Sequence, residues 1–353
     1  MSVVITGIGI VSPAGIGMDA FARAIAVPPR LEAGFRVPAF GLEKHVGNPS
    51  SFRRVADATK FTLAAISMAL SDAGLDRDRR RSGREGLLVG VTHGAIDFST
   101  RFHQGLLLEG PQGASPLHFT ESVLNAPAGN AAIAFGFRGP VHTLIGEETV
   151  GGNAIVMALS LLRSGELDRC VVAGVEEWAD IVVSAYDRVD RARGMGGHGS
   201  EPPVPLGEGA AALVLETAAV ASQRSAASRG TIHGVISRRL HPPAMSAAVE
   251  EAVRGVIDSA ACRTEEIGHV VLPTGRYRRE VEHGTACVLG ERANVIRWID
   301  IATHVGNPFG ASGLMQVAAS VARHAYGGGQ CGLVLSCGVE GGFFALVTGS
   351  EGR

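Results

Sequence analysis

Lysine is nearly absent from this 353-residue chain. Its 32 basic side chains comprise 30 Arg and only two Lys, at Lys44 and Lys60. We interpret this scarcity as a composition bias of the host, but it also means that no chemistry after Lys60 can use a lysine. The formal net charge is −2 and no basic run dominates the sequence, so nucleic acid is not an expected partner.

Clustered metal ligands and paired cysteines are also lacking. The 12 His are dispersed and the five Cys form no CxxC pair, so we expect no metal site and no bound cofactor. An odd number of scattered cysteines is typical of reduced, mostly buried thiols in the cytosol, which predicts a cytoplasmic protein. The five are Cys170, Cys262, Cys287, Cys331 and Cys337.

The sequence contains no long hydrophobic run. No apolar stretch approaches the ~20 residues that a membrane-spanning helix needs, so we expect no contact with a membrane. Residues 1–17 are apolar, but they lack a basic segment and are interrupted by glycines and Pro13. We interpret them as a first strand and turn rather than a signal peptide.

The sequence does contain an alternation of strand and helix patterns. Apolar residues make up 46% of the chain and charged residues 19%, as in an ordinary globular protein. Continuous apolar strands between helices indicate sheets that are covered by helices on both faces. We expect strands at 2–11, 85–94, 169–175 and 269–275, helices at 59–75, 151–168 and 246–261, a strand running into a helix at 209–224, and two strands about a glycine turn at 332–349.

Two segments of the chain echo each other. Residues 166–178 and 328–342 both run from a helix into an apolar strand that contains a cysteine, and both continue with Gly-Val-Glu. The echo predicts two similar α/β halves, residues 1–225 and 226–353, which form one compact unit. The Gly- and Pro-rich segment 191–209 is predicted to be a loop rather than a linker between them.

One segment has the layout of a nucleophile site without a nucleophile. Residues 139–155, GPVHTLIGEETVGGNAI, read as a short strand, a tight turn and a helix that opens on glycines. Enzymes often place a reactive Cys or Ser at such a turn, because the helix N-terminus stabilises negative charge. Here the turn carries Glu147 and Glu148 instead.

Six stretches, in order along nearly the whole chain, resemble the β-ketoacyl-acyl carrier protein synthase family. The resemblance implies the thiolase fold of that family, an α/β fold of two similar halves in a layered αβαβα arrangement. The chain is shorter than is usual in the family, with trimming near 25–45 and 240–245. The six stretches are VVITGIGIVSPAG (3–15), TLAAISMALSDAGLD (62–76), residues 115–140, PLGEGAAALVLE (205–216), GNPFGASG (306–313) and GVEGGFFALV (338–347).

The resemblance also implies where a catalytic set would stand. Members of the family use a Cys nucleophile, two His donors and a Lys, together with an aromatic gate. In this sequence none of those residues is present at the matching positions. The nucleophile position falls on Glu148, the first His on Thr274 or Pro273, the second His on Asn307, the Lys on Ala302 and the gate on Val339.

A tripeptide elsewhere imitates the first His motif. His283-Gly284-Thr285 matches the residues that the family uses around that His. It lies too close to Gly306, however, and within a predicted helix that leads to Leu289-Gly290. We therefore interpret His283 as a coincidence rather than a catalytic residue.

The pattern of replaced residues predicts a chain-length-factor-like subunit. Such subunits of type II polyketide and aryl-polyene systems lack activity of their own and pair with an active ketosynthase to elongate chains on an acyl carrier protein. The resemblance implies a heterodimer in which this chain shapes the acyl tunnel. The strand before the turn would pair across the dimer axis, which predicts interface roles for Val141, His142, Thr143, Leu144, Ile145 and Glu147.

Two other functions remain open on the sequence alone. One is an acyl-thioester hydrolase or transferase that uses Glu148 as a general base. The other is a non-catalytic scaffold that binds acyl carriers without forming a tunnel. The basic clusters 76–85 and 276–280 could contact an acidic carrier or simply be solvated loops.

The two glutamates of the turn have several expected roles. Glu148 would fill and lock the vacated turn, imitate the charge of a thiolate or acyl intermediate, or act as a base. Burial would raise its pKa and hydrogen bonds at the helix N-terminus would lower it. Glu147 would point to another side of the turn, where it caps backbone groups or pairs with an Arg.

Overall fold

The computed structural model describes most of the chain. It covers residues 2–28, 35–75, 84–192, 205–241, 244–275, 277–325, 327 and 329–350. Most of the predicted loop 191–209 and of the basic cluster 76–85 lies outside these ranges, as does Arg276 of the second basic cluster.

The strands of the described residues form one mixed sheet, whose path runs β4-β3-β5-β6-β1-β7-β11-β10-β8-β9, with β2 paired to β1. The sheet is continuous because β1 and β7 pair over three residues, Val3–Ile5 with Gly230–Ile232. The strands are β1 (Val3–Ser12), β2 (Gly15–Ile16), β3 (Glu85–Val91), β4 (Val141–Ile145), β5 (Arg169–Glu176), β6 (Gly209–Thr217), β7 (Gly230–Arg239), β8 (Ile267–Val271), β9 (Arg297–Ile299), β10 (Cys331–Cys337) and β11 (Gly342–Gly349).

The strand order repeats on the two sides of this β1–β7 pairing, which we call the seam. In the first half β4, β3 and β5 run parallel, and β6 and β1 follow as antiparallel neighbours. In the second half β9, β8 and β10 run parallel, and β11 and β7 follow in the same way. The two similar halves expected from the echo are therefore present, and the echoed segments contain the equivalent strands β5 and β10. The domain boundary after residue 225 stays a prediction; it falls between α8 and β7.

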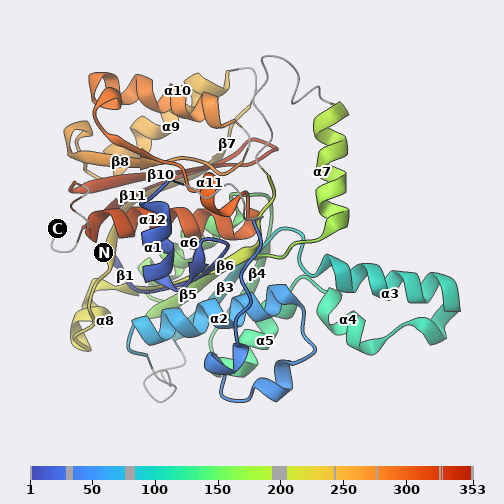
Figure 1. Cartoon of the computed structure of the whole chain (residues 1–353). Coiled ribbons are helices and arrows are strands. Elements are labelled where there is room, and N and C mark those ends of the chain that lie inside the picture. The colour runs from blue at the N-terminus through green and yellow to red at the C-terminus, as the bar shows by residue number, and fades with distance from the viewer. Residues whose placement is uncertain are drawn as a thin grey trace.

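The two half-sheets are layered with helices (Figure 1). Helices α9 and α10 cover the outer face of the second half, α6 and α12 lie between the halves, and α2 and α5 cover the outer face of the first. This is the expected αβαβα arrangement. The helices are α1 (Met18–Ile25), α2 (Asp57–Asp72), α3 (Ile96–Glu109), α4 (Pro116–Ser122), α5 (Ala126–Phe135), α6 (Val150–Arg163), α7 (Asp180–Ala192), α8 (Ala218–Gln223), α9 (Met245–Ser259), α10 (Arg278–Leu289), α11 (Ala302–Val305) and α12 (Ser312–Ala325).

Glycines allow α6 to pack tightly between the two half-sheets. A Cβ atom on Gly151 would lie 2.4 Å from Cδ1 of Leu314 in α12, and one on Gly152 would lie 2.5 Å from Cγ of Phe344 in β11. Both distances are shorter than real contacts, so only glycine fits. This close packing fixes the N-terminus of α6, and with it the turn that carries Glu148.

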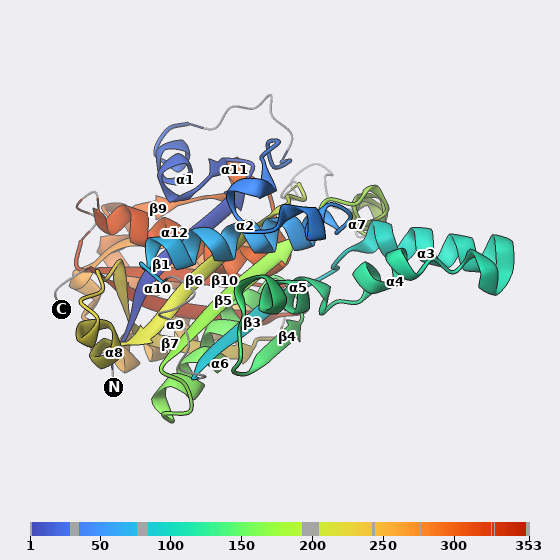
Figure 2. The same cartoon turned by 90° about the horizontal axis from the view of Figure 1, so that it is seen from below.

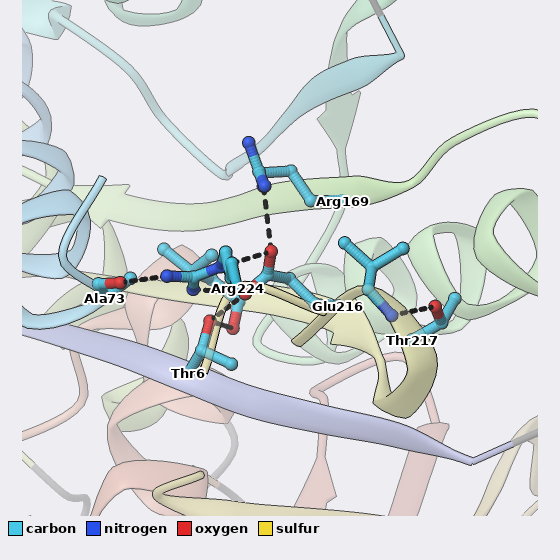
Figure 3. A network of polar contacts seen from close by, with 8 residues as sticks. Thr6, Ala73, Arg169, Glu216, Thr217 and Arg224 are labelled. Carbon is cyan, nitrogen blue, oxygen red and sulfur yellow. Dashed lines mark hydrogen bonds and ion pairs between the residues drawn. The ribbon is translucent and has the colours of Figure 1, made fainter. Parts of the chain in front are cut away.

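A buried carboxylate ties the first half together (Figure 3). Glu216 at the end of β6 is fully buried, and its oxygens accept hydrogen bonds from Thr6 at 2.8 Å, from Arg169 at 2.9 Å and from Arg224. Arg224 also donates to the carbonyl oxygen of Ala73 at 2.6 Å. Burial alone would raise the pKa of Glu216, but the bonds from Arg224 and Thr6 and the charge of Arg169 hold it below its ordinary value. The network therefore joins β1, β5 and β6 to the segment after α2.

Three helices stand away from the layered body. Figure 2 shows α3 and α4 as a projecting arm, and Figure 1 shows α7 beside the body. Neither α3 nor α7 has a buried residue. No helix in the described residues is long and apolar enough to span a membrane. In the same residues, no group of three or more His, Cys, Asp or Glu is arranged to hold a metal ion.

Candidate functional site

The turn at Glu147 and Glu148 lies where parallel strands end. Strand β4 pairs with β3, β3 pairs with β5, and all three run parallel, so their carboxyl ends meet at one edge of the sheet. Ligand sites of α/β proteins commonly lie at such an edge. The chain leaves β4 at Ile145 and enters α6 at Val150, so the two glutamates precede the helix N-terminus.

Glu148 is buried and hydrogen-bonded within its own chain. Its side chain belongs to a residue that is only 1% exposed. Oε1 accepts a hydrogen bond from Nδ2 of Asn307 at 3.1 Å, and Oε2 accepts one from the backbone N–H of Val339 at 3.2 Å. A Cβ atom on Gly275 would lie 2.9 Å from Oε1, so the carboxylate packs directly against that glycine. Three of the predicted site residues, Glu148, Asn307 and Val339, therefore meet.

Thr274 joins the same network through Asn307. The Thr274 hydroxyl lies 2.8 Å from Oγ of Ser312 and 3.4 Å from Oδ1 of Asn307, and all three residues are buried. Oδ1 of Asn307 also accepts the backbone N–H of Phe309 at 3.2 Å. The amide thus turns its oxygen toward hydroxyl and backbone donors and its nitrogen toward Glu148. Of the two candidates for the first His position, it is Thr274 and not Pro273 whose side chain takes part.

Ala302, which the resemblance aligns with the family's Lys, has no polar side-chain group. It is buried at the start of α11, and its backbone N–H donates to Oδ1 of Asp300 at 3.0 Å. Val339 is half-buried and contributes only its backbone N–H to the network. Neither side chain therefore carries a charge or an aromatic ring.

Burial raises the pKa of Glu148. Desolvation raises the pKa of the carboxyl above its ordinary value, and the hydrogen bonds from Asn307 and Val339 offset this only in part. The adjacent Glu147 carboxylate adds a further rise. Of the two opposing effects expected from the sequence, desolvation is the larger, so the neutral carboxylic acid is favoured more than in an exposed glutamate.

Glu147 caps the turn between β10 and β11. Its Oε2 accepts the backbone N–H of Glu340 at 2.6 Å, and its Oε1 accepts that of Gly342 at 2.8 Å. The expected capping role is confirmed, with backbone groups rather than an Arg as the donors. Together with the Val339 bond to Glu148, the paired glutamates attach this turn to the N-terminal end of α6.

A second pair, the half-buried His93 and the buried Glu176, borders the site and was missed by the sequence analysis. His93 follows β3 and Glu176 ends β5, and Nδ1 of His93 lies 3.2 Å from Oε1 of Glu176. The distance is that of an ion pair, although neither atom is aligned for a hydrogen bond, so we treat the contact as electrostatic. Both residues lie at the carboxyl ends of neighbouring parallel strands, and that position is the signal that could have identified them.

Aromatic rings surround His93. Its ring lies edge-on to Phe309, with centroids 4.8 Å apart, and Nε2 lies 3.4 Å from the Tyr186 hydroxyl. Phe309 has a φ of 36°, an uncommon backbone conformation for a non-glycine residue. Burial alone would lower the pKa of His93, but the carboxylates of Glu176 and Glu148 raise it above its ordinary value. His93 is thus electrostatically coupled to the Glu148 turn.

His283 lies apart from these residues. It is exposed on α10, in the outer helix layer, and Nε2 lies 3.9 Å from Sγ of Cys287 on the same helix. The prediction that it belongs to a helix leading to Leu289-Gly290 is confirmed.

The predicted interface strand lies at the edge of the sheet. Within the described residues β4 pairs with β3 alone, so its other edge is unpaired. Val141, Thr143 and Leu144 are half-buried, whereas His142 is exposed and Ile145 is 63% exposed. An unpaired apolar edge of this kind favours pairing with another chain.

The layered fold of two equivalent halves defines the class of the protein as thiolase-like. The sequence profile described as "Beta-ketoacyl synthase, N-terminal domain" matches residues 39–221, just over half of the chain. The chain belongs to the β-ketoacyl synthase family.

Curated relatives carry the same family assignment. The chain is 28% identical to "Putative polyketide beta-ketoacyl synthase 1" of Streptomyces halstedii, over 90% of this chain and 84% of the relative. It is 26% identical to 3-oxoacyl-[acyl-carrier-protein] synthase 2 of Staphylococcus aureus strain COL, over 64% of this chain. That match spans 59% of the Staphylococcus protein.

Solved structures show the same fold over the whole chain. The ishigamide ketosynthase/chain length factor has a TM-score of 0.86 at 20% identity, with 99% of each chain covered. A type II PKS acyl-carrier protein in complex with its ketosynthase bound to the hexaketide gives a TM-score of 0.81 at 20% identity, again with 99% of each chain covered. A β-ketoacyl synthase from Burkholderia phymatum gives 0.85 at 18% identity, covering 99% of this chain and all of the other. At these identities the likeness establishes the fold.

Proposed function

We propose that this chain is a non-catalytic, chain-length-factor-like partner of an active ketosynthase. In this proposal the two form a heterodimer that elongates chains on an acyl carrier protein, and this chain shapes the acyl tunnel and the interface. The observation that carries the proposal is the buried Glu148 at the nucleophile position, with both carboxylate oxygens bonded to Asn307 and Val339 of the same chain. The names of the structural relatives, a ketosynthase/chain length factor and a ketosynthase with its carrier protein, support the choice of partners.

The chemistry of the network argues against condensation by this chain. Condensation needs a thiolate nucleophile and donors that stabilise an enolate. Here Glu148 replaces the thiol, and Asn307 directs its amide N–H at Glu148 instead of at a substrate. The Thr274 hydroxyl is likewise occupied with Ser312. The polar groups at the old catalytic positions satisfy one another.

The same contacts argue against Glu148 as a general base. A base must reach the proton that it removes, with an oxygen free to accept it. Both oxygens of Glu148 already accept hydrogen bonds, and the residue is 1% exposed. The hydrolase or transferase alternative would therefore require the turn to open.

Exposed apolar surface supports a partner subunit. Ile145 on the edge strand and Ile133 on α5 are 63% and 74% exposed, and Leu107 and Leu108 on the projecting α3 are 82% and 83% exposed. Phe119 on α4 is 53% exposed. Concentrations of exposed apolar side chains mark protein interaction sites, because water disfavours them. We therefore place the partner against β4 and the α3–α4 arm.

Co-purification tests the proposal. A tagged form of this chain is expressed together with a ketosynthase that carries Cys-His-His and is encoded beside it. We expect a 1:1 complex by native mass spectrometry, and we expect Ile145→Lys to reduce its recovery at least tenfold because a charge would be placed in the interface. Val295→Lys serves as the matched control, since Val295 is 74% exposed but lies before β9, far along the sheet from β4. Recovery of this chain only as a homodimer would contradict the proposal, and a carrier complex without a ketosynthase would favour a scaffold.

A further inference from the structure

A cavity of about 520 Å³ lies between α1, β9, α11 and α12. Figure 1 shows α1 and α11 next to α12 of the central layer. The cavity shares no lining residue with the network around Glu148. Its volume is within the range of small-molecule sites, about 300–1,000 Å³. Ala22 and Ile25 of α1, Ile299 of β9, and Ala319 and Ala322 of α12 give it an apolar lining.

Two arginines on the wall of this cavity have no partner in the described part of the chain. Arg297 at the start of β9 and Arg323 near the end of α12 both line it, and neither guanidinium group makes a hydrogen bond or an ion pair with a described residue. Nε of Arg323 is buried and has no hydrogen-bond partner. A buried donor without a partner is unfavourable, and native proteins rarely leave one unsatisfied. Among the described residues, none therefore provides an acceptor for Nε of Arg323.

The remaining polar groups of the cavity are already engaged. Asp300 lines the wall, but its Oδ2 lies 2.6 Å from Nη1 of Arg278, which compensates its charge. Nε2 of His304 lies 2.9 Å from the carbonyl oxygen of Val27. The unpaired charge that faces the cavity is therefore positive and is carried by Arg297 and Arg323.

We propose that this cavity binds a small amphipathic anion. The apolar part of the ligand packs on the alanines and isoleucines of the lining, and a carboxylate or phosphate accepts hydrogen bonds from the guanidinium of Arg323, with Arg297 adding a second positive charge. The planar fork of arginine matches these two anions because it can donate two parallel hydrogen bonds. The site is independent of the proposed ketosynthase partnership.

The chain offers a built-in reporter for this site. Trp298 lines the cavity, and the chain has only one other tryptophan, Trp178, which is outside it. In a Trp178→Phe variant the fluorescence therefore comes from Trp298. We expect octanoate or octyl phosphate to change the Trp298 fluorescence saturably. Octanol, octylammonium and inorganic phosphate should change the fluorescence at least tenfold less at equal concentration. Comparison of octanoate with octyl phosphate shows which head group the site prefers.

Substitutions in the Trp178→Phe background test the assignment to Arg323. Arg323→Gln is expected to weaken binding of the preferred ligand by about tenfold or more, because a charge-assisted hydrogen bond is lost. Arg188→Gln, on the exposed face of α7, is the matched control and should leave binding unchanged. Ala26→Phe at the exposed rim is expected to weaken the binding of both anions by filling the entrance. Thermal unfolding is used to confirm that each variant folds.

Three results would each overturn the proposal: a saturable response to octylammonium equal to that of the anions, no saturable response to either anion, or unchanged binding in Arg323→Gln.

Discussion

Buried carboxylates in this chain are stabilised in two different ways. Glu216 forms ion pairs with two arginines, which hold its pKa below the ordinary value despite complete burial. Glu148 accepts hydrogen bonds from a side-chain amide and a backbone N–H, but within the described structure it forms no ion pair. Its pKa is raised. A carboxyl group whose pKa is raised fits a locking role at this turn better than imitation of a thiolate charge.

The locking role predicts a loss of stability when Glu148 is truncated. Glu148→Ala leaves the Asn307 amide and the Val339 N–H buried without an acceptor, so we expect the free energy of unfolding to fall by about 2 kcal/mol or more. Urea denaturation of the purified chain measures this. Glu109→Ala, an exposed glutamate at the end of α3, is the control and should change stability by less than about 0.5 kcal/mol. An equal effect of the two substitutions would contradict the locking role.

The raised pKa of Glu177 predicts how the stability of the fold changes with pH. Burial raises its pKa to about 8, although the backbone N–H of Ala58 donates to Oε2 at 2.9 Å. Between the ordinary pKa and about 8 the folded state holds a proton that the unfolded state releases, so this group makes stability fall as pH rises. In Glu177→Gln the free energy of unfolding should therefore decline less between pH 5 and 9 than in the parent chain. Parallel pH profiles of the two proteins would show that the pKa of Glu177 is not raised.

The sequence predicted part of the site and could not predict the rest. Motif spacing placed Glu148 and Asn307 at matching positions, and their contact follows from the shared fold. It could not decide between Thr274 and Pro273, because that choice depends on where a local gap in the alignment is placed. In the structure it is the Thr274 hydroxyl that bonds to Ser312. The sequence also could not pair His93 with Glu176, which lies 83 positions later. The two residues meet only because β3 and β5 are neighbours in the sheet.

Single elements were predictable where their apolar pattern was strong. The predicted helices 59–75 and 246–261 correspond to Asp57–Asp72 and Met245–Ser259, within about three residues at each end. The arm formed by α3 and α4 was not predicted as helix, because none of the residues of α3 is buried and no apolar stripe faces the body. The helix pattern is therefore informative only where a helix packs against its own chain.

The packing of α6 predicts opposite effects for two glycine substitutions in helices. Gly152→Ala would bring a methyl group within 2.5 Å of the Phe344 ring, and we expect it to lower the free energy of unfolding by about 1–3 kcal/mol. Gly129→Ala in α5 meets no atom within 4 Å and should raise it by up to about 1 kcal/mol, since alanine favours helix. Chemical denaturation of both variants measures the difference. Equal effects would mean that α6 is not closely held between the half-sheets.

At the scale of the whole molecule, the fold prediction rested on the family resemblance and on a sequence echo between the two halves. The echo between residues 166–178 and 328–342 correctly indicated two equivalent halves, because the two segments contain β5 and β10, which occupy equivalent places in the two half-sheets. The seam at β1 and β7 could not be anticipated, since it depends on a three-residue pairing between distant segments. The periodicity of the sequence could not indicate a partner chain either. The physical grounds for proposing one are the unpaired edge of β4 and the exposed apolar side chains of the α3–α4 arm.

Chain elongation by the reconstituted pair tests the central claim most directly. The complex of this chain with its ketosynthase is supplied with acyl and malonyl groups on the carrier protein, and the products are measured by mass spectrometry. We expect Glu148→Gln in this chain to leave the rate within about twofold, because its carboxyl group does no chemistry, and substitution of the nucleophilic Cys in the ketosynthase to abolish elongation. Turnover of acyl thioesters by this chain alone, lost in Glu148→Gln, would contradict the claim.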